Sequence, residues 1–167
     1  MPLAGHPSAM AEQTAPADRP VRLDDAFELQ AGRAYMTGMQ ALVRLPLEQR
    51  RRDREQGLDT RGFISGYRGS PLGGYDSEIQ RNHARLKAAG IHFEPGLNEE
   101  LAATAVLGTQ QASVFGGARQ DGVFALWYGK GPGVDRSGDA FRHGVRAGAA
   151  RHGGVLLAFG DDHPGKS

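Results

Sequence analysis

The chain alternates between short apolar runs and longer stretches of helical periodicity, and its apolar runs lead into glycine-containing loops. Runs rich in β-branched and aromatic residues predict strands at 62–67, 91–96, 122–129 and 155–159. The spacing of apolar residues predicts helices at 38–57, 76–90, 98–117 and 134–154. Strands that alternate with helices of this length imply a parallel sheet with helices on both faces. The expected fold class is therefore α/β.

In such a sheet the loops that follow the strands open at one edge, the carboxyl edge, where ligands bind. The loops of this kind are "GYRGSPLGG" at 66–74, "PGLNEE" at 95–100, "YGKGPGVD" at 128–135 and "GDDHPGKS" at 160–167. We therefore expect the functional residues in these segments.

Length and composition predict one folded domain preceded by a tail. Residues 1–20 hold four of the nine prolines and almost no large apolar side chain, so we expect a disordered tail in which Met10 could equally be the start. The remaining residues, 21–167, are long enough for a single domain with a substantial core.

The charges nearly cancel, with 20 basic and 19 acidic side chains, so we expect neither nucleic acid nor a membrane surface as a partner. There is no cysteine, which excludes disulfides and any thiolate metal site or iron–sulfur cluster held by this chain. No apolar run is long enough to span a bilayer and no signal peptide is apparent, so the expected location is cytoplasmic.

The last loop matches the P-loop pattern G-x-x-x-x-G-K-S at Gly160–Ser167. Asp161 and Asp162 would place negative charge beside a polyphosphate, and no helix follows to face it, so we favour a coincidental match. A nucleotide-binding protein that uses Lys166 and Ser167 stays open as an alternative. The same acids and His163 could hold a hard cation, but a polar strand-end loop is the simpler interpretation and no metal site is predicted.

Two adjacent acids, Glu99 and Glu100, stand where the second loop becomes a helix. Asn98 is a natural N-cap, and acids in a first turn stabilise the helix dipole whether or not they have a function. The helix behind them, residues 101–108, is rich in small side chains, which would let a flat ligand come close. A carboxylate held there in an apolar cleft could exchange a proton with a bound heterocycle.

Taken together, "GYRGSPLGG", "NEELAATA" and "GKGPG" resemble the pyrimidine-binding domain of the 2-oxoacid:ferredoxin oxidoreductases, a family of thiamine diphosphate enzymes. The closest likeness is to the indolepyruvate:ferredoxin oxidoreductase branch, and it runs from about Arg22 to the end of the chain. The resemblance implies a fold of the thiamine diphosphate-binding, pyrimidine-domain type. Because no helix follows the fourth loop, that domain is expected to be C-terminally incomplete, so that the chain looks like an N-terminal fragment.

The resemblance also implies roles for single residues. Glu100 matches the acid that hydrogen-bonds the aminopyrimidine ring of the cofactor and is catalytic. If Glu99 were aligned with that acid instead, the small residues that follow would be shifted by one position from the family pattern. Ser70 matches a hydroxyl residue near the cofactor and the substrate carboxylate. Tyr67 and Gly69 belong to the same cofactor-binding loop.

Two further assignments follow from the resemblance. Arg68 replaces a proline found in many relatives and is a candidate for binding the substrate carboxylate, although a solvated loop charge is an equally good interpretation. Gly131, Pro132 and Gly133 correspond to a turn that lines the pyrimidine pocket. Lys130 and Asp135 are weaker candidates beside it.

For the full enzyme, the resemblance implies oxidative decarboxylation of an aromatic 2-oxo acid such as indolepyruvate to an acyl-CoA, with ferredoxin as the electron acceptor. Mg²⁺ and the diphosphate would be held by a second domain, and [4Fe–4S] clusters by cysteines, neither of which this chain contains. The chain is then half of a cofactor site, inactive alone, within an enzyme expected to be a homo-oligomer. A non-catalytic interaction module is the remaining alternative.

Overall fold

A computed structural model describes residues 20–69, 72–112 and 114–161, and nearly all of the predicted tail lies outside this part of the chain. Its strands form one parallel sheet in the order β2-β1-β3-β4. The strands are β1 (Thr60–Gly66), β2 (Ile91–Phe93), β3 (Gly122–Lys130) and β4 (Gly154–Gly160). The predicted α/β class with a parallel sheet is confirmed.

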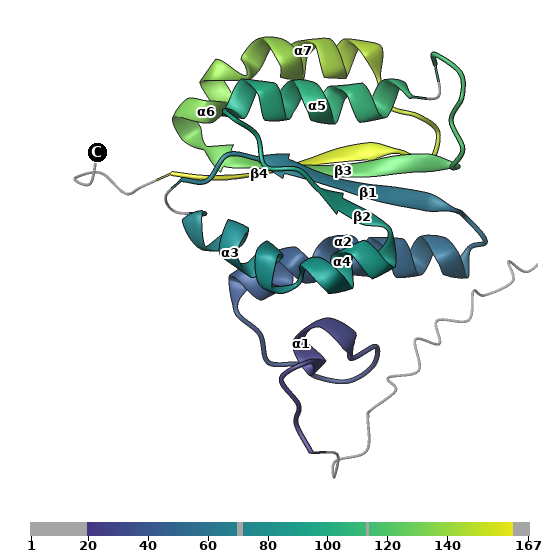
Figure 1. Cartoon of the computed structure of the whole chain (residues 1–167), viewed down its shortest axis with the longest axis vertical. Helices are drawn as coiled ribbons and strands as arrows, with labels where there is room; N and C mark the ends of the chain where they lie inside the picture. Colours follow the sequence, from purple (N-terminus) through teal and green to yellow (C-terminus); the bar gives the residue numbers. More distant parts are fainter. Residues whose placement is uncertain (1–19, 70–71, 113, 162–167) are drawn as a thin grey trace, which may run out of the picture.

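Helices cover both faces of the sheet, as predicted (Figure 1). The helices on one face are α5 (Glu99–Gln111), α6 (Gly131–Arg136) and α7 (Gly138–Ala147). Those on the other face are α2 (Gly38–Glu55), α3 (Gly73–Arg81) and α4 (His83–Ala89), with the short α1 (Asp25–Glu28) packed beyond α2. None of the helices in these described ranges is long and apolar enough to cross a membrane.

The direction of the chain across the sheet reverses beside β1. From β1 the chain goes to β2 on one side, and from β2 it returns over α5 to β3 on the other side of β1. In doubly wound sheets ligands bind at the carboxyl ends of the strands on either side of this reversal, called the switch point. Here these are the ends of β1 and β3, at Gly66 and Lys130.

Each face of the sheet has its own hydrophobic core because side chains alternate along β3. Leu126 and Tyr128 join the core under α2, α3 and α4, whereas Ala125 and Trp127 join the core under α5. Trp127 is fully buried and its ring meets that of Phe141 edge-on at 5.0 Å between centroids. The middle of β3 is therefore buried on both faces, as is typical of an interior parallel strand.

Two of the predicted helices are interrupted. The helix expected at 76–90 is the pair α3 and α4, separated by the buried Asn82, whose side-chain amide donates to the carbonyl of Glu78. The helix expected at 134–154 is the pair α6 and α7, separated by Ser137 and ended by Gly148 with φ of 76°. The helix α2 continues through Pro46.

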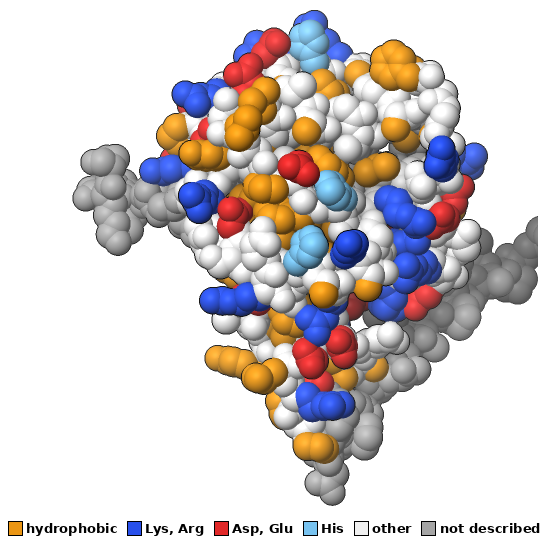
Figure 2. Space-filling view, in the orientation of Figure 1, with side chains coloured by type: hydrophobic (Ala, Val, Ile, Leu, Met, Phe, Trp, Pro, Cys, Tyr) orange, Lys and Arg blue, Asp and Glu red, His pale blue; other side chains and the backbone are white. Residues whose placement is uncertain are grey.

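Charged side chains of both signs are interspersed over the face seen in Figure 2. Several are paired, including Arg51 with Glu48 and Glu55, and Arg85 with Asp24 and Glu28. The arginine-rich end of α2 is thus partly neutralised by its own neighbours.

Candidate functional site

The loops after β1 and β2 meet directly at the carboxyl edge. The amide of Gly96 donates to the carbonyl of Gly66 at 2.9 Å. A Cβ at Gly96 would lie 2.7 Å from the Cβ of Ala102, and a Cβ at Gly66 would overlap the carbonyl oxygen of Tyr128. Glycine is needed at both positions because a side chain would clash with the neighbouring segment. Its absence lets the start of α5 pack closely against the end of β1.

Glu99 begins α5 and faces the third loop segment. Its side chain is only 17% exposed, and it lies so close to α6 that a Cβ at Gly133 would overlap its Cγ. The indole N–H of Trp127 donates to the Glu99 carbonyl at 3.1 Å, and Arg136 Nη1 lies 3.8 Å from Glu99 Oε2. The Glu99 carboxylate is therefore partly buried at the carboxyl edge, between β3 and α6.

Glu100 lies one position further along α5 and is exposed. Successive residues on an α-helix point about 100° apart, so only one of the two adjacent acids can face α6. The side chain of Asn98 accepts a hydrogen bond from the amide of Leu101 at 2.8 Å, as predicted for an N-cap, and this fixes the first turn. Glu99 therefore faces α6, and Glu100, for which the resemblance implies the catalytic role, lies on the exposed side of α5; that role stays a prediction.

The segment after β1 crosses the switch point toward β3. The amide of Tyr67 donates to the carbonyl of Tyr128 at 3.1 Å, while the side chains of Tyr67 and Arg68 are exposed. A Cβ at Gly69 would lie 3.8 Å from the Cβ of Lys130, which is an ordinary contact, so this position does not require glycine for space. Ser70 lies outside the described residues.

The segment predicted as a turn, Gly131-Pro132-Gly133, is instead the first turn of α6. Proline suits this position because a first-turn amide has no intrahelical acceptor. A Cβ at Gly131 would lie 2.6 Å from Asp161 Oδ2, just as one at Gly133 would overlap Glu99. The two glycines therefore admit two carboxylates against one short helix, while Asp135 on that helix is exposed.

Beneath the β1 loop lies a tyrosine pair that the sequence reasoning missed. The hydroxyl of Tyr128 donates to the carboxylate of Asp76, and that of Tyr75 donates to the carbonyl of Leu42 at 3.2 Å. The rings meet edge-on at 5.1 Å, and burial raises the pKa of both phenols. This pair ties the first turn of α3, and with it the end of the β1 loop, to β3.

The described residues contain no group of three His, Asp or Glu side chains that could hold a metal ion. Asp161 is described and exposed, whereas Asp162, His163, Lys166 and Ser167 lie outside the described residues, so the P-loop alternative stays untested.

The fold and the edge define a doubly wound α/β domain with a partly buried carboxylate near its switch point. No family model, curated protein or solved structure matches the chain.

Proposed function

We propose that this chain is the pyrimidine-binding half of a thiamine diphosphate-dependent 2-oxoacid:ferredoxin oxidoreductase of the indolepyruvate branch. The observation that carries the proposal is the Glu99 carboxylate, which is partly buried at the start of α5 and packed against the glycine-containing turn of α6. Proton exchange with a ring nitrogen requires a positioned acid of this kind.

The residues present fit the pyrimidine half of the cofactor. Buried Ala102 and Ala103 follow Glu99 on α5, so the helix is narrow just behind the acid. Asn98 and Trp127 hold the turn that carries Glu99, and the exposed ring of Tyr67 lies on the neighbouring loop. When bound, thiamine diphosphate supplies the electron sink for decarboxylation of a 2-oxo acid. This chain supplies the acid, its orientation and the walls around it.

The other half of the site belongs to another domain. Mg²⁺ and the diphosphate need several oxygen ligands, and the described part of the chain gathers no such group. Iron–sulfur clusters need cysteines, which the sequence lacks. On the resemblance of the sequence motifs, the aromatic 2-oxo acid, CoA and ferredoxin are proposed as partners of the complete enzyme. The exposed Arg68 is the candidate that would meet the substrate carboxylate.

The adjacent acids provide the test. In the complete enzyme we expect Glu99→Gln to lower turnover by roughly 10²–10⁴-fold, the usual range for loss of an acid–base group. The matched control, Glu100→Gln, changes the same chemistry one position away on the exposed side and should be mild. A larger loss of turnover in Glu100→Gln than in Glu99→Gln would instead support Glu100 as the catalytic acid, as the sequence resemblance implies. Small and equal effects would refute the thiamine assignment.

Cofactor binding can be measured separately from turnover. Trp127 is the single tryptophan, and its indole N–H bonds to the Glu99 carbonyl, so its fluorescence reports on this turn. In the complete enzyme, with any tryptophan outside this chain replaced by phenylalanine, thiamine diphosphate should change that signal and should bind more weakly to Glu99→Gln. An interaction module would give no cofactor-dependent change in either protein.

A further inference from the structure

Tyr128 of β3 contacts both ends of the segment that joins β1 to α3. Its backbone carbonyl accepts a hydrogen bond from the amide of Tyr67 at 3.1 Å, where the segment begins. Its phenol donates to the carboxylate of Asp76 in the first turn of α3, just after the segment has ended. One residue of β3 therefore holds the chain both before and after the loop that follows β1.

The ring of Tyr128 fills the space beside the end of β1. Tyr128 is paired with Gly66 in the sheet and is completely buried, and a Cβ at Gly66 would overlap its ring. Removal of the whole side chain would therefore leave a cavity, whereas removal of the hydroxyl alone keeps this packing. Phenylalanine separates the two contributions, because it keeps the ring and loses only the donor to Asp76.

The Tyr128 hydroxyl remains a donor under ordinary conditions. Burial, together with the hydrogen bond to Asp76, raises the pKa of this phenol, so it stays protonated at neutral pH. A hydrogen bond from a hydroxyl to a carboxylate is stronger than one between neutral groups. The start of α3 is thus fixed to the sheet by a strong bond that persists at physiological pH.

The neighbouring Tyr75 is buried to the same degree but has a different partner. Its side chain is also completely inside the protein, and its ring meets that of Tyr128 edge-on at 5.1 Å. Its hydroxyl donates to the carbonyl of Leu42 at 3.2 Å, so it ties α3 to the helix α2 rather than to the sheet. Loss of either hydroxyl removes one buried hydrogen bond, but the bond between α3 and β3 depends on Tyr128.

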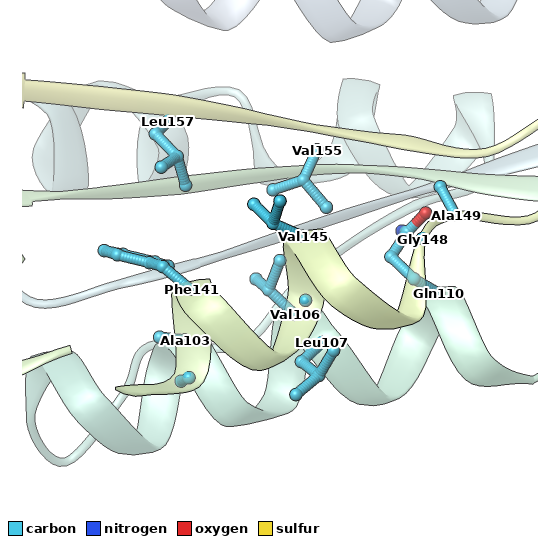
Figure 3. Close-up of a pocket in the computed structure, with 12 residues that line it drawn as sticks. Ala103, Val106, Leu107, Gln110, Phe141, Val145, Gly148, Ala149, Val155 and Leu157 are labelled. Carbon is cyan, nitrogen blue, oxygen red and sulfur yellow. The ribbon is translucent and has the colours of Figure 1, made fainter. Parts of the chain in front are cut away.

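The opposite face of β3 is separate from this connection. There Trp127 packs on Phe141, which lines a cavity of about 250 Å³ between α5, α7 and β4 (Figure 3). The indole N–H of Trp127 donates to the carbonyl of Glu99, so this residue reports on the turn that carries the acid. Loss of the Tyr128 hydroxyl should therefore alter the loop after β1 and leave the turn of Glu99 in place.

We propose that Tyr128 is a positioning residue whose hydroxyl, through Asp76, sets where the loop after β1 presents Tyr67 and Arg68. Both of these side chains are exposed and follow directly on the end of β1, at the switch point where ligands bind in such sheets. The bond at α3 restricts the directions that this loop can take, and such restriction is what a binding site requires. That the ligand is a 2-oxo acid rests on the proposed function, whereas the positioning itself does not.

Steady-state kinetics of the complete enzyme test the proposal. Tyr128→Phe should raise the KM for the 2-oxo acid by roughly tenfold and leave kcat within about twofold, because the loop is displaced while Glu99 is not. The matched control, Tyr75→Phe, loses the same group from the same core and should change neither constant. A merely structural role would give both variants the same small effect, and that result would overturn the proposal.

Asp76 allows a second test from the other end of the bond. Asp76→Asn keeps an oxygen that can accept from Tyr128 and should retain nearly the natural KM, whereas Asp76→Ala should reproduce the effect of Tyr128→Phe. Combining Asp76→Ala with Tyr128→Phe should add little further change, because both remove the same bond. Additive effects on KM would contradict a role of Tyr128 through Asp76.

Hydrogen exchange measures the positioning without any ligand. In the complete enzyme the amides of residues 67–69 and 73–76 should exchange at least several-fold faster in Tyr128→Phe than in Tyr75→Phe. Circular dichroism establishes that each variant is folded, and the emission of Trp127 should stay unchanged once tryptophans outside this chain are replaced. Faster exchange in Tyr128→Phe, combined with a natural enzyme that binds no thiamine diphosphate, would refute the proposed function but support the positioning. Equal exchange in the two variants would overturn the positioning.

Discussion

Two glycine substitutions at the carboxyl edge should differ sharply in their effect on stability. Alanine at Gly66 would overlap a backbone atom, the carbonyl oxygen of Tyr128, inside the pairing of β1 with β3. Alanine at Gly133 would overlap the side chain of Glu99, which can rotate away. Backbone in the middle of a sheet cannot move aside in this way without breaking the strand pairing. The added methyl group should therefore destabilise the protein much more at Gly66 than at Gly133.

The magnitudes follow from this difference. Overpacking in a well-packed interior costs about 1–3 kcal/mol, and we expect Gly66→Ala to cost about 3 kcal/mol. Gly133 lies inside α6, where alanine is favoured over glycine by about 1 kcal/mol, and this gain offsets much of the clash with Glu99. The net change for Gly133→Ala should therefore stay within about 1 kcal/mol, while the Glu99 carboxylate is displaced.

Urea denaturation followed by the fluorescence of Trp127 measures both variants. With a slope of about 2 kcal/mol per molar, Gly66→Ala should lower the urea midpoint by roughly 1.5 M, and Gly133→Ala by less than about 0.5 M. The emission of the folded Gly133→Ala protein should nevertheless shift, because Trp127 bonds to the Glu99 carbonyl. Equal losses of stability in the two variants would refute this account of the edge.

Two further predictions concern the interior. Burial raises the pKa of Tyr75 and Tyr128 above the ordinary value near 10. Their contribution to stability is therefore complete below about pH 10 and is lost as the pH rises. Between pH 8 and pH 11 the urea midpoint should fall less in Tyr128→Phe than in the natural chain. Arg50 is 4% exposed, donates to the carbonyls of Leu58 and Ala89, each at 3.2 Å, and pairs with the Asp59 carboxylate at 2.8 Å. Arg50→Met should therefore cost roughly 2–4 kcal/mol, because it removes all three interactions and leaves the Leu58 carbonyl without this donor. Exposed Arg81→Met is its control, and a comparable loss there would contradict the argument.

The order of elements could be predicted because each strand is an apolar run and each helix has a recognisable period. The parallel sheet with helices on both faces follows from that order alone. The breaks at Asn82 and Ser137 could not be predicted, because each depends on a buried polar residue and on packing between helices. The helical start of α6 was missed since Gly-Pro-Gly is typical of a turn, and only contacts with two carboxylates explain its glycines.

That these loops meet at the carboxyl edge was predictable, but which of Glu99 and Glu100 faces α6 was not. Both acids suit the first turn of a helix, and both precede small residues. Which one turns inward depends on the rotation of α5, and this is set by Asn98 and by the distant Trp127. The Tyr128–Asp76 hydrogen bond joins residues 52 positions apart, and no local pattern signals it.

The rotation of α5 can itself be tested at Asn98. Its side-chain oxygen accepts from the Leu101 amide, and alanine removes this acceptor from a first turn with no other side-chain cap described. We expect Asn98→Ala to cost about 1 kcal/mol, and Asn98→Asp to keep most of the stability because aspartate is an equally good N-cap. In the urea assay the two variants should therefore separate by roughly 0.5 M.

If Asn98→Asp were as destabilising as Asn98→Ala, the added negative charge beside Glu99 and Glu100 would outweigh the cap. Repulsion among the carboxylates would then destabilise the first turn of α5. Raising the salt concentration distinguishes the two cases, since screening should relieve repulsion between carboxylates but leave a lost hydrogen bond unchanged. A salt-independent deficit in Asn98→Asp would instead show that the side-chain amide has a second role, beyond capping the turn that directs Glu99 toward α6.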